Sequence, residues 1–266
     1  AQVALNYGLF CRELVLHGAL DERDRRFLGD MAANTAREIY VNKFLLPNEF
    51  LVGAMRDLEA EPRERYLRAA IEFEPREARP DPPAAWPTHA ARHAVLSSGG
   101  KDSLVTLGML RELGLEAQPL FVNESGRHWY TALNAHRHLA ATLAGTARVW
   151  TNSDRVFAWM LRHLPFVRQD WHKVRADIYP IRLWTVAVFL FGALPVMRRH
   201  GIGRLLIGDE FDTSRRVRYE GIGHYDGLYD QSRYFDDGLT RYYQRKQWGL
   251  CQFSFLRPLS ELLVEK

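Results

Sequence analysis

The residues best suited to chemistry form one short segment, made of Ser97, Ser98, Gly99, Gly100, Lys101, Asp102 and Ser103. An apolar run, residues 93–96, precedes it, and an amphipathic helical pattern, residues 104–113, follows. A strand that turns through glycines into a helix directs backbone N–H groups at one point, where the helix dipole favours negative charge. Ser hydroxyls and a lysine add donors. The segment therefore predicts a phosphate site; the alternative is a Gly/Ser turn with a helix N-cap.

Two further segments carry charges that call for a partner. Arg182 stands one turn into an apolar helical pattern, where a cation opposes the helix dipole, so we expect an anion beside it. Asp209, Glu210 and Asp212 lie within four residues and repel one another unless a cation such as Mg²⁺, or a substrate amine, lies among them. The alternatives are a solvated arginine and a solvated acidic loop.

Polar and aromatic residues follow the acidic segment. They suit a loop that closes over a polar substrate, and we expect Glu210 to take part in it. The candidate substrate-binding residues in this part of the chain are Arg215, Tyr229, Asp230 and Arg233.

The elements that must position these residues alternate along the second part of the chain. Strands are predicted at 93–96, 117–122, 147–151, 204–207 and 251–256, and helices at 102–113, 130–143, 183–200 and about 231–245. This alternation predicts an α/β fold, a parallel sheet of about five strands with helices on both faces. Ligands of such sheets bind at the carboxyl ends of the strands, and each candidate segment follows a predicted strand or opens a predicted helix.

The sequence motif Ser-Gly-Gly-x-Asp-Ser, residues 98–103, resembles the pyrophosphate loop of the PP-loop, or N-type, ATP pyrophosphatases, which have a HUP-type fold. A Walker-type loop needs a different spacing. The resemblance implies an enzyme that binds Mg-ATP, cleaves it to AMP and pyrophosphate, and thereby activates a carboxylate or carbonyl oxygen of a small molecule. It implies that Lys101 and Arg182 offset phosphate charge and that Asp102, with Asp209 or Asp212, binds magnesium or orients donors.

The end of the second predicted strand carries a further group of candidate residues. The loop there borders the phosphate segment, so Val122 and Asn123 are expected to contact the base and ribose, with Gly208 on the neighbouring strand end. Arg127 and His128 are candidates for substrate binding, and His128 could act as a general base. The alternatives are a polar turn at the strand end and a structural histidine.

Within that superfamily, the order of the motifs is most similar to cyano-deazaguanine synthase of the queuosine pathway. That family carries a C-terminal zinc-binding cysteine cluster, which would have to lie beyond Lys266, and it lacks an N-terminal helical domain. A second relative, the ATP-dependent epimerase of a glutamate residue in a UDP-muramoyl dipeptide, has a Gly-Gly-Lys-Asp-Ser loop behind an extra N-terminal domain. A non-catalytic nucleotide-binding regulatory module is a third interpretation.

Composition sets the remaining bounds. The chain has 266 residues, 47% of them hydrophobic, and a net charge of +4 without a basic run, so nucleic acid is not an expected partner. Cys11 and Cys251 form no metal-binding or disulfide pattern. The longest apolar run, 183–197, is shorter than a membrane span. We expect a cytoplasmic setting, no membrane contact, and leave a homo-oligomer open.

Prolines divide the chain. Five of them fall within 75–87, which predicts a linker over 75–90. Before it, helical spacing at 5–16 and 25–45 predicts a helical N-terminal domain over 1–74. After it, we expect the ATP pyrophosphatase domain over 91–266. Residues 256–266 are interpreted as a strand end, a Pro-Leu turn and a helix that has barely begun, so we expect the natural polypeptide to continue or mobile segments to be missing.

Overall fold

The chain forms two compact units, each built from three stretches of sequence. The computed structural model describes residues 6–74, 85–122, 128–174, 185–209, 215–225 and 229–254. The first unit comprises Ala1–Pro80, Asn152–Thr185 and Arg215–Asp230, and the second comprises Asp81–Thr151, Val186–Ser214 and Gln231–Lys266. The first unit thus includes two stretches from beyond the proline cluster. The boundaries at 1–74, 75–90 and 91–266 stay a prediction.

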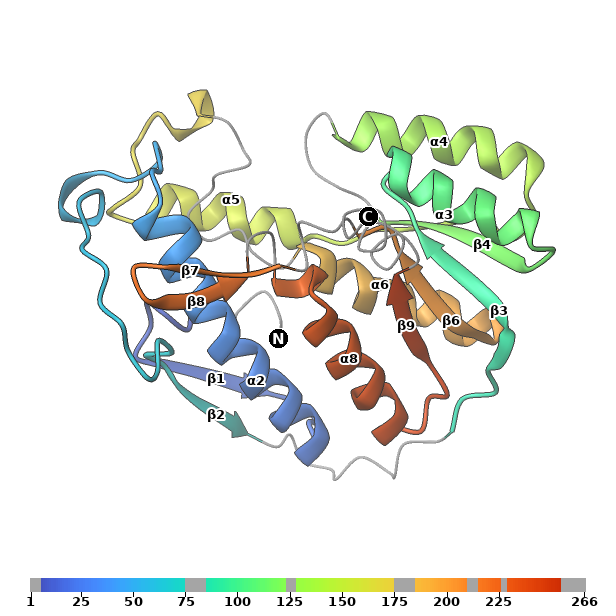
Figure 1. Cartoon of the computed structure of the whole chain (residues 1–266), viewed down its shortest axis with the longest axis horizontal. Coiled ribbons are helices and arrows are strands. Elements are labelled where there is room, and N and C mark those ends of the chain that lie inside the picture. Colours follow the sequence, from blue (N-terminus) through green and yellow to red (C-terminus); the bar gives the residue numbers. More distant parts are fainter. Residues whose placement is uncertain are drawn as a thin grey trace, which may run out of the picture. The chain divides into compact units, whose positions relative to one another are not determined.

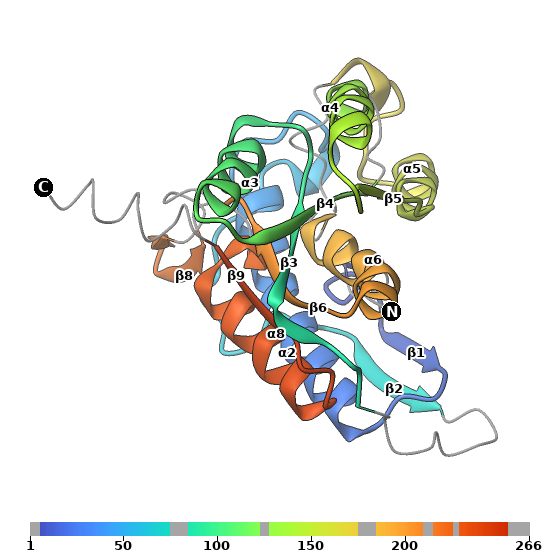
Figure 2. The same cartoon turned by 90° about the vertical axis from the view of Figure 1, so that its right-hand side faces the viewer.

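The second unit contains a five-stranded parallel sheet with the order β5-β4-β3-β6-β9 (Figure 1; all five strands are labelled in Figure 2). Its strands alternate with helices, which confirms the predicted α/β architecture. The strands in chain order are β3 (His89–Leu96), β4 (Glu116–Val122), β5 (Ala147–Val149), β6 (Ile202–Ile207) and β9 (Cys251–Ser254).

Helices cover both faces of this sheet (Figure 2). One face packs Val95, Leu206 and Phe253 against apolar residues of α3 and α4. On the other face, α6 lies over the ends of β4 and β5, and α8 is hydrogen-bonded to β9 through Thr240. The helices are α3 (Lys101–Glu112), α4 (His128–Thr142), α6 (Thr185–His200) and α8 (Arg233–Arg245), which follows the 3₁₀ turn η5 (Tyr229–Gln231).

The strand order creates one position where ligands of such sheets bind. From β3 the chain continues to β4 on one side, and it later returns to place β6 on the other side of β3. Crossovers that leave in opposite directions open a crevice at the carboxyl ends of the two strands. The loop 97–100 follows β3, and Gly208 and Asp209 follow β6, so both predicted segments border this switch point.

The first unit begins with a strand where a helix was predicted. Residues 5–16 show helical spacing, but β1 (Glu13–His17) pairs in parallel with β2 (Ala70–Glu74). The pairing joins residues that are more than fifty positions apart, and such long-range hydrogen bonding can override a local pattern. The helix prediction for 5–16 is therefore wrong.

The second predicted helix of this region is present, with an irregular end. α2 (Glu22–Ile39) starts at a capping box, in which the Asp21 carboxylate accepts from the Asp24 backbone N–H at 3.0 Å and the Asp24 carboxylate accepts from that of Asp21 at 2.9 Å. Asp21 and Asp24 together thus satisfy the first free N–H groups of the helix and fix where it begins. The helix continues as the π-helical η1 (Tyr40–Leu45).

Elements from later in the chain complete the first unit. α5 (Ser153–His163) contributes Phe157, which packs on Tyr7, and Leu161, which packs on Phe50. The antiparallel hairpin β7 (Arg216–Tyr219) and β8 (Ile222–Tyr225) is joined to α2 by a hydrogen bond from the Tyr225 N–H. The short 3₁₀ turns η2 (Gly53–Met55) and η3 (Trp171–Lys173) also belong here. In the described parts of both units, no helix has the length and apolarity of a membrane span.

Candidate functional site at the end of strand β3

The two glycines of the loop after β3 have different structural roles. Gly99 has a φ of +78°, and a Cβ atom there would lie 2.8 Å from the Thr131 backbone oxygen and 2.9 Å from the Ala135 Cβ. The loop thus turns directly beneath α4, where only glycine fits. Gly100 has an ordinary φ of −79° and forms the N-cap of α3. A Cβ at Gly100 would meet only the Ser98 Oγ, at 3.3 Å, so its bare backbone faces open space.

Two buried hydroxyls hold the loop in this shape. The Oγ atoms of Ser97 and Ser103 lie 2.9 Å apart. The Ser97 Oγ also accepts from the Gly99 backbone N–H at 3.1 Å, and the Ser103 Oγ donates to the Gly100 carbonyl at 3.1 Å. Ser98, by contrast, is exposed. Of the three predicted hydroxyls, only that of Ser98 is therefore open to a ligand in this structure.

The first turn of α3 places a cation at the mouth of the loop. The Lys101 side chain is 75% exposed, and its Nζ lies 2.8 Å from the Asp102 carboxylate. The first backbone N–H groups of a helix have no partner within the helix, and the dipole makes this end positive. The arrangement of Gly100, Ser98 and Lys101 at the start of a twelve-residue helix suits an anion with several oxygens.

The end of β6 closes against this turn. A Cβ atom at Gly208 would lie 2.8 Å from the Asp102 Cβ and 3.0 Å from the Ser103 nitrogen, so β6 approaches α3 at van der Waals contact only because Gly208 has no side chain. Asp209 follows, is buried, and donates its N–H to the Ser254 Oγ at 3.3 Å. The structure thus brings together two segments that the sequence predicted separately.

Several predicted site residues lie outside the described residues: Asn123, Arg127, Arg182, Glu210 and Asp212. His128 opens α4, and Val122 is buried at the end of β4, beside the loop. Among the described residues, no three His, Cys, Asp or Glu side chains are arranged to hold a metal ion. The magnesium assignment to Asp102, Asp209 and Asp212 stays a prediction.

The residues predicted to form a loop over the substrate belong to both units. Arg215 is exposed before β7, whereas Tyr229 and Asp230 are buried in the first unit. The Tyr229 hydroxyl donates to the Asp30 carboxylate at 3.4 Å. Arg233 is exposed in the first turn of α8, in the second unit. Their grouping around one substrate stays a prediction.

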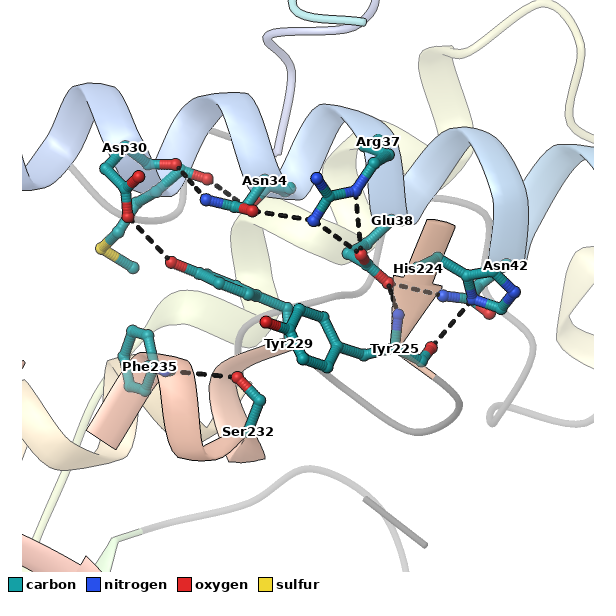
Figure 3. A network of polar contacts seen from close by, with 12 residues as sticks. Asp30, Asn34, Arg37, Glu38, Asn42, His224, Tyr225, Tyr229, Ser232 and Phe235 are labelled. Atoms are coloured by element: carbon teal, nitrogen blue, oxygen red, sulfur yellow. Dashed lines mark hydrogen bonds and ion pairs between the residues drawn. The ribbon is translucent and has the colours of Figure 1, made fainter. Parts of the chain in front are cut away.

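A buried carboxylate of the first unit, Glu38, has no local signal in the sequence, and its contacts are shown in Figure 3. Glu38 of α2 is fully buried and accepts hydrogen bonds from the Arg37 guanidinium, the Asn42 amide and the Tyr225 backbone N–H. Burial raises the pKa of Glu38 to about 7, although these donors act in the opposite direction. Glu38 thereby joins α2 to the hairpin β7–β8.

Part of the chain is similar to a known protein family. Residues 60–148 match the family model described as the MurL N-terminal domain. The matched range contains β2, β3, the loop 97–100, α3, β4, α4 and the first two residues of β5. No curated protein matches this chain.

Proposed function

We propose that the chain is an ATP-dependent epimerase that inverts the terminal glutamate of a UDP-muramoyl dipeptide. The observation that carries the proposal is the match of residues 60–148 to the MurL N-terminal domain, because that range includes the whole β3–loop–α3 segment. The family named in this match is the second relative that the loop sequence indicated.

The reaction needs an activated substrate. The Cα–H of a glutamate is barely acidic while the adjacent carboxylate carries its negative charge. ATP, when bound, would convert that carboxylate into a mixed anhydride with AMP, releasing pyrophosphate and making the Cα–H acidic enough for removal and for return of a proton to the opposite face. Water then cleaves the anhydride and restores the carboxylate.

The residues of the loop have distinct tasks in this proposal. The Gly100 backbone, the first-turn N–H groups of α3 and the exposed Ser98 hydroxyl would hold phosphate oxygens. Lys101 would offset the charge that builds up on the departing pyrophosphate. The buried pair Ser97 and Ser103 would keep the loop in its binding shape without touching the ligand.

A second candidate is an AMP-forming synthase that joins a nucleophile to the activated carboxylate, as in amide or nitrile formation. The sequence of the loop and the order of the motifs favour this candidate, since both resemble those of cyano-deazaguanine synthase. Both candidates produce AMP and pyrophosphate, whereas the third interpretation, a regulatory nucleotide-binding module, produces neither. The fate of the substrate Cα–H separates the two enzymes.

The test combines substrate, ATP and Mg²⁺ in deuterated water. The full chain is incubated with a UDP-muramoyl-alanyl-L-glutamate substrate, and the glutamate is released by hydrolysis for chiral analysis and mass spectrometry. The epimerase predicts D-glutamate with one deuterium at Cα, together with AMP. AMP without inversion, in the presence of ammonia, indicates the synthase. If the mixture gives no AMP and no inversion, the epimerase is contradicted.

A matched pair of glycine variants connects the activity to the loop. Gly100→Val places a side chain where the phosphates would lie and should abolish AMP formation. Gly108→Val, in the middle of the same helix and facing open space, should retain it. Equal activity of the two variants would remove the loop from the proposal.

A further inference from the structure

A group of two tryptophans and an arginine lies at the edge of the parallel sheet. The rings of Trp129 and Trp150 are 5.0 Å apart between centroids, at an interplanar angle of 56°. The Arg148 guanidinium lies 5.9 Å from the Trp129 ring centroid and 5.2 Å from that of Trp150. We refer to Trp129, Arg148 and Trp150 as the indole–arginine cluster.

The sheet and α4 together form this cluster. Arg148 pairs with Phe121 in the β4–β5 register, and Phe121 packs edge-on against His136 of α4, with ring centroids 5.5 Å apart. Arg148 therefore lies on the face that α4 covers. Trp150 lies two residues further along and points to the same face, and Trp129 belongs to the first turn of α4.

Two members of the cluster, Arg148 and Trp150, are exposed, and Trp129 is half-buried. Trp150 is 62% exposed and Tyr130, beside Trp129, is 67% exposed. Exposed large apolar groups that gather in one place mark binding surfaces more often than single exposed residues do. The indole–arginine cluster also lies at the carboxyl end of β5, the same edge of the sheet as the loop after β3, with β4 between them. At the usual spacing of strands, the strands β5 and β3 are about 10 Å apart.

We propose that the indole–arginine cluster stacks the base of a nucleotide. An indole face binds any planar heteroaromatic ring, and the guanidinium supplies hydrogen-bond donors and a positive charge for base or phosphate oxygens. Two bases fit this chemistry under the proposed function, on which this inference rests: the adenine of ATP and the uracil of the UDP-muramoyl substrate. Tryptophan and arginine are also frequent at protein interfaces, but the carboxyl edge of a parallel sheet favours a small ligand.

The test measures binding of three anions to the full chain by calorimetry. ATP and UDP carry a base, and inorganic tripolyphosphate does not. Trp150→Ala is expected to weaken binding of one nucleotide by roughly 5- to 150-fold, the range for loss of one stacked base, and to leave tripolyphosphate binding unchanged. The nucleotide affected identifies the base. Trp150→Tyr retains an aromatic face and should recover most of the affinity.

Trp159 provides the matched control. It is 53% exposed on α5 and stacks on His163, in the first unit, so Trp159→Ala should bind all three anions as the parent does. The inference is overturned if the parent binds neither nucleotide, if Trp150→Ala binds both as the parent does, or if it loses tripolyphosphate to the same degree. If nucleotide binding depends on Trp150 but no epimerisation occurs, the stacking site stands and the proposed function fails.

Discussion

The Ser97 hydroxyl lies 2.9 Å from the Ser103 hydroxyl, which links the end of β3 to the first turn of α3 across the phosphate-type loop. Both side chains are buried, and the Ser97 Oγ also accepts the N–H of Gly99. The loop is therefore held in its shape before any ligand arrives. Preorganised donors bind a ligand without the cost of ordering them at the time of binding.

The serines of the loop should separate into stabilising and binding residues. Ser97→Ala leaves the Gly99 N–H without its acceptor and should lower the free energy of unfolding by about 1–3 kcal/mol. The exposed Ser98→Ala should change it by less than about 0.5 kcal/mol while weakening ATP binding. Urea denaturation and nucleotide calorimetry check both variants. A stable Ser97→Ala with normal ATP affinity would contradict the role assigned to this hydrogen bond.

Gly99 and Gly100 should likewise differ in how much a side chain at each position lowers the stability of the fold. Gly99→Ala forces a positive φ on a side-chain residue and drives its Cβ into the Thr131 carbonyl, so we expect a loss of about 2 kcal/mol or more of stability. Gly100→Ala carries no such strain and should keep its melting temperature. Thermal denaturation without ligand separates them. Similar melting temperatures for both variants would mean that the loop does not lie beneath α4 as described.

Glu38 should make stability depend on pH. Its pKa is raised from 4.5 to about 7, so between these values the folded chain holds a proton that the unfolded chain has lost. This contribution to stability is fully present below about pH 4.5 and is lost as the pH rises through 7, by at most about 3 kcal/mol. Unfolding free energies at pH 5 and pH 7.5 measure it.

Glu38→Gln is the control for this prediction. The amide cannot ionise but keeps an oxygen that can accept from the Tyr225 N–H, so the variant should lose most of the fall in stability between pH 5 and pH 7.5. Asp237→Asn, an exposed substitution on α8, should retain the dependence of the parent. An unchanged pH profile in Glu38→Gln would assign the dependence to other groups.

The turn of the hairpin β7–β8 offers a stabilising substitution. Glu220 and Gly221 have φ values of +48° and +83°, as in a two-residue hairpin turn with left-handed residues. Asparagine tolerates this region better than glutamate does, so Glu220→Asn should raise stability by up to about 1 kcal/mol. Gly221→Ala should lower it by about 1–2 kcal/mol, since its Cβ would meet only the Pro62 Cγ, at an ordinary contact distance of 3.6 Å, and only backbone strain acts. Chemical denaturation that ranks these variants in the opposite order would contradict the turn geometry.

The Mg²⁺ requirement of an Asp209 variant tests the predicted magnesium site. Asp209 is buried directly after β6, close to the loop, and its N–H is held by Ser254. If its carboxylate serves the metal, Asp209→Asn should raise the Mg²⁺ concentration for half-maximal AMP formation by roughly tenfold or more. The same titration on Asp237→Asn provides the baseline. A midpoint equal to that baseline would assign Asp209 a structural role.

The individual strands and helices around the loop, and the position of the loop between β3 and α3, follow from local patterns in the sequence. Apolar runs, the helical period and the paired glycines of residues 93–113 are short-range signals, and the predicted strands and helices of this region are present. The capping box at Asp21 and Asp24 is equally local. Such features follow from neighbouring residues alone.

Which residues meet across the chain depends on the three-dimensional arrangement of the backbone. The pairing of β1 with β2, the contact of Gly99 with Thr131, the burial of Glu38 against the hairpin, and the meeting of Trp129 with Trp150 each join residues that are distant in sequence. Their stability comes from packing and from hydrogen bonds shielded from water, which depend on the final arrangement of the backbone. A local pattern carries no signal for such contacts, so the helix predicted at 5–16 yielded to a strand.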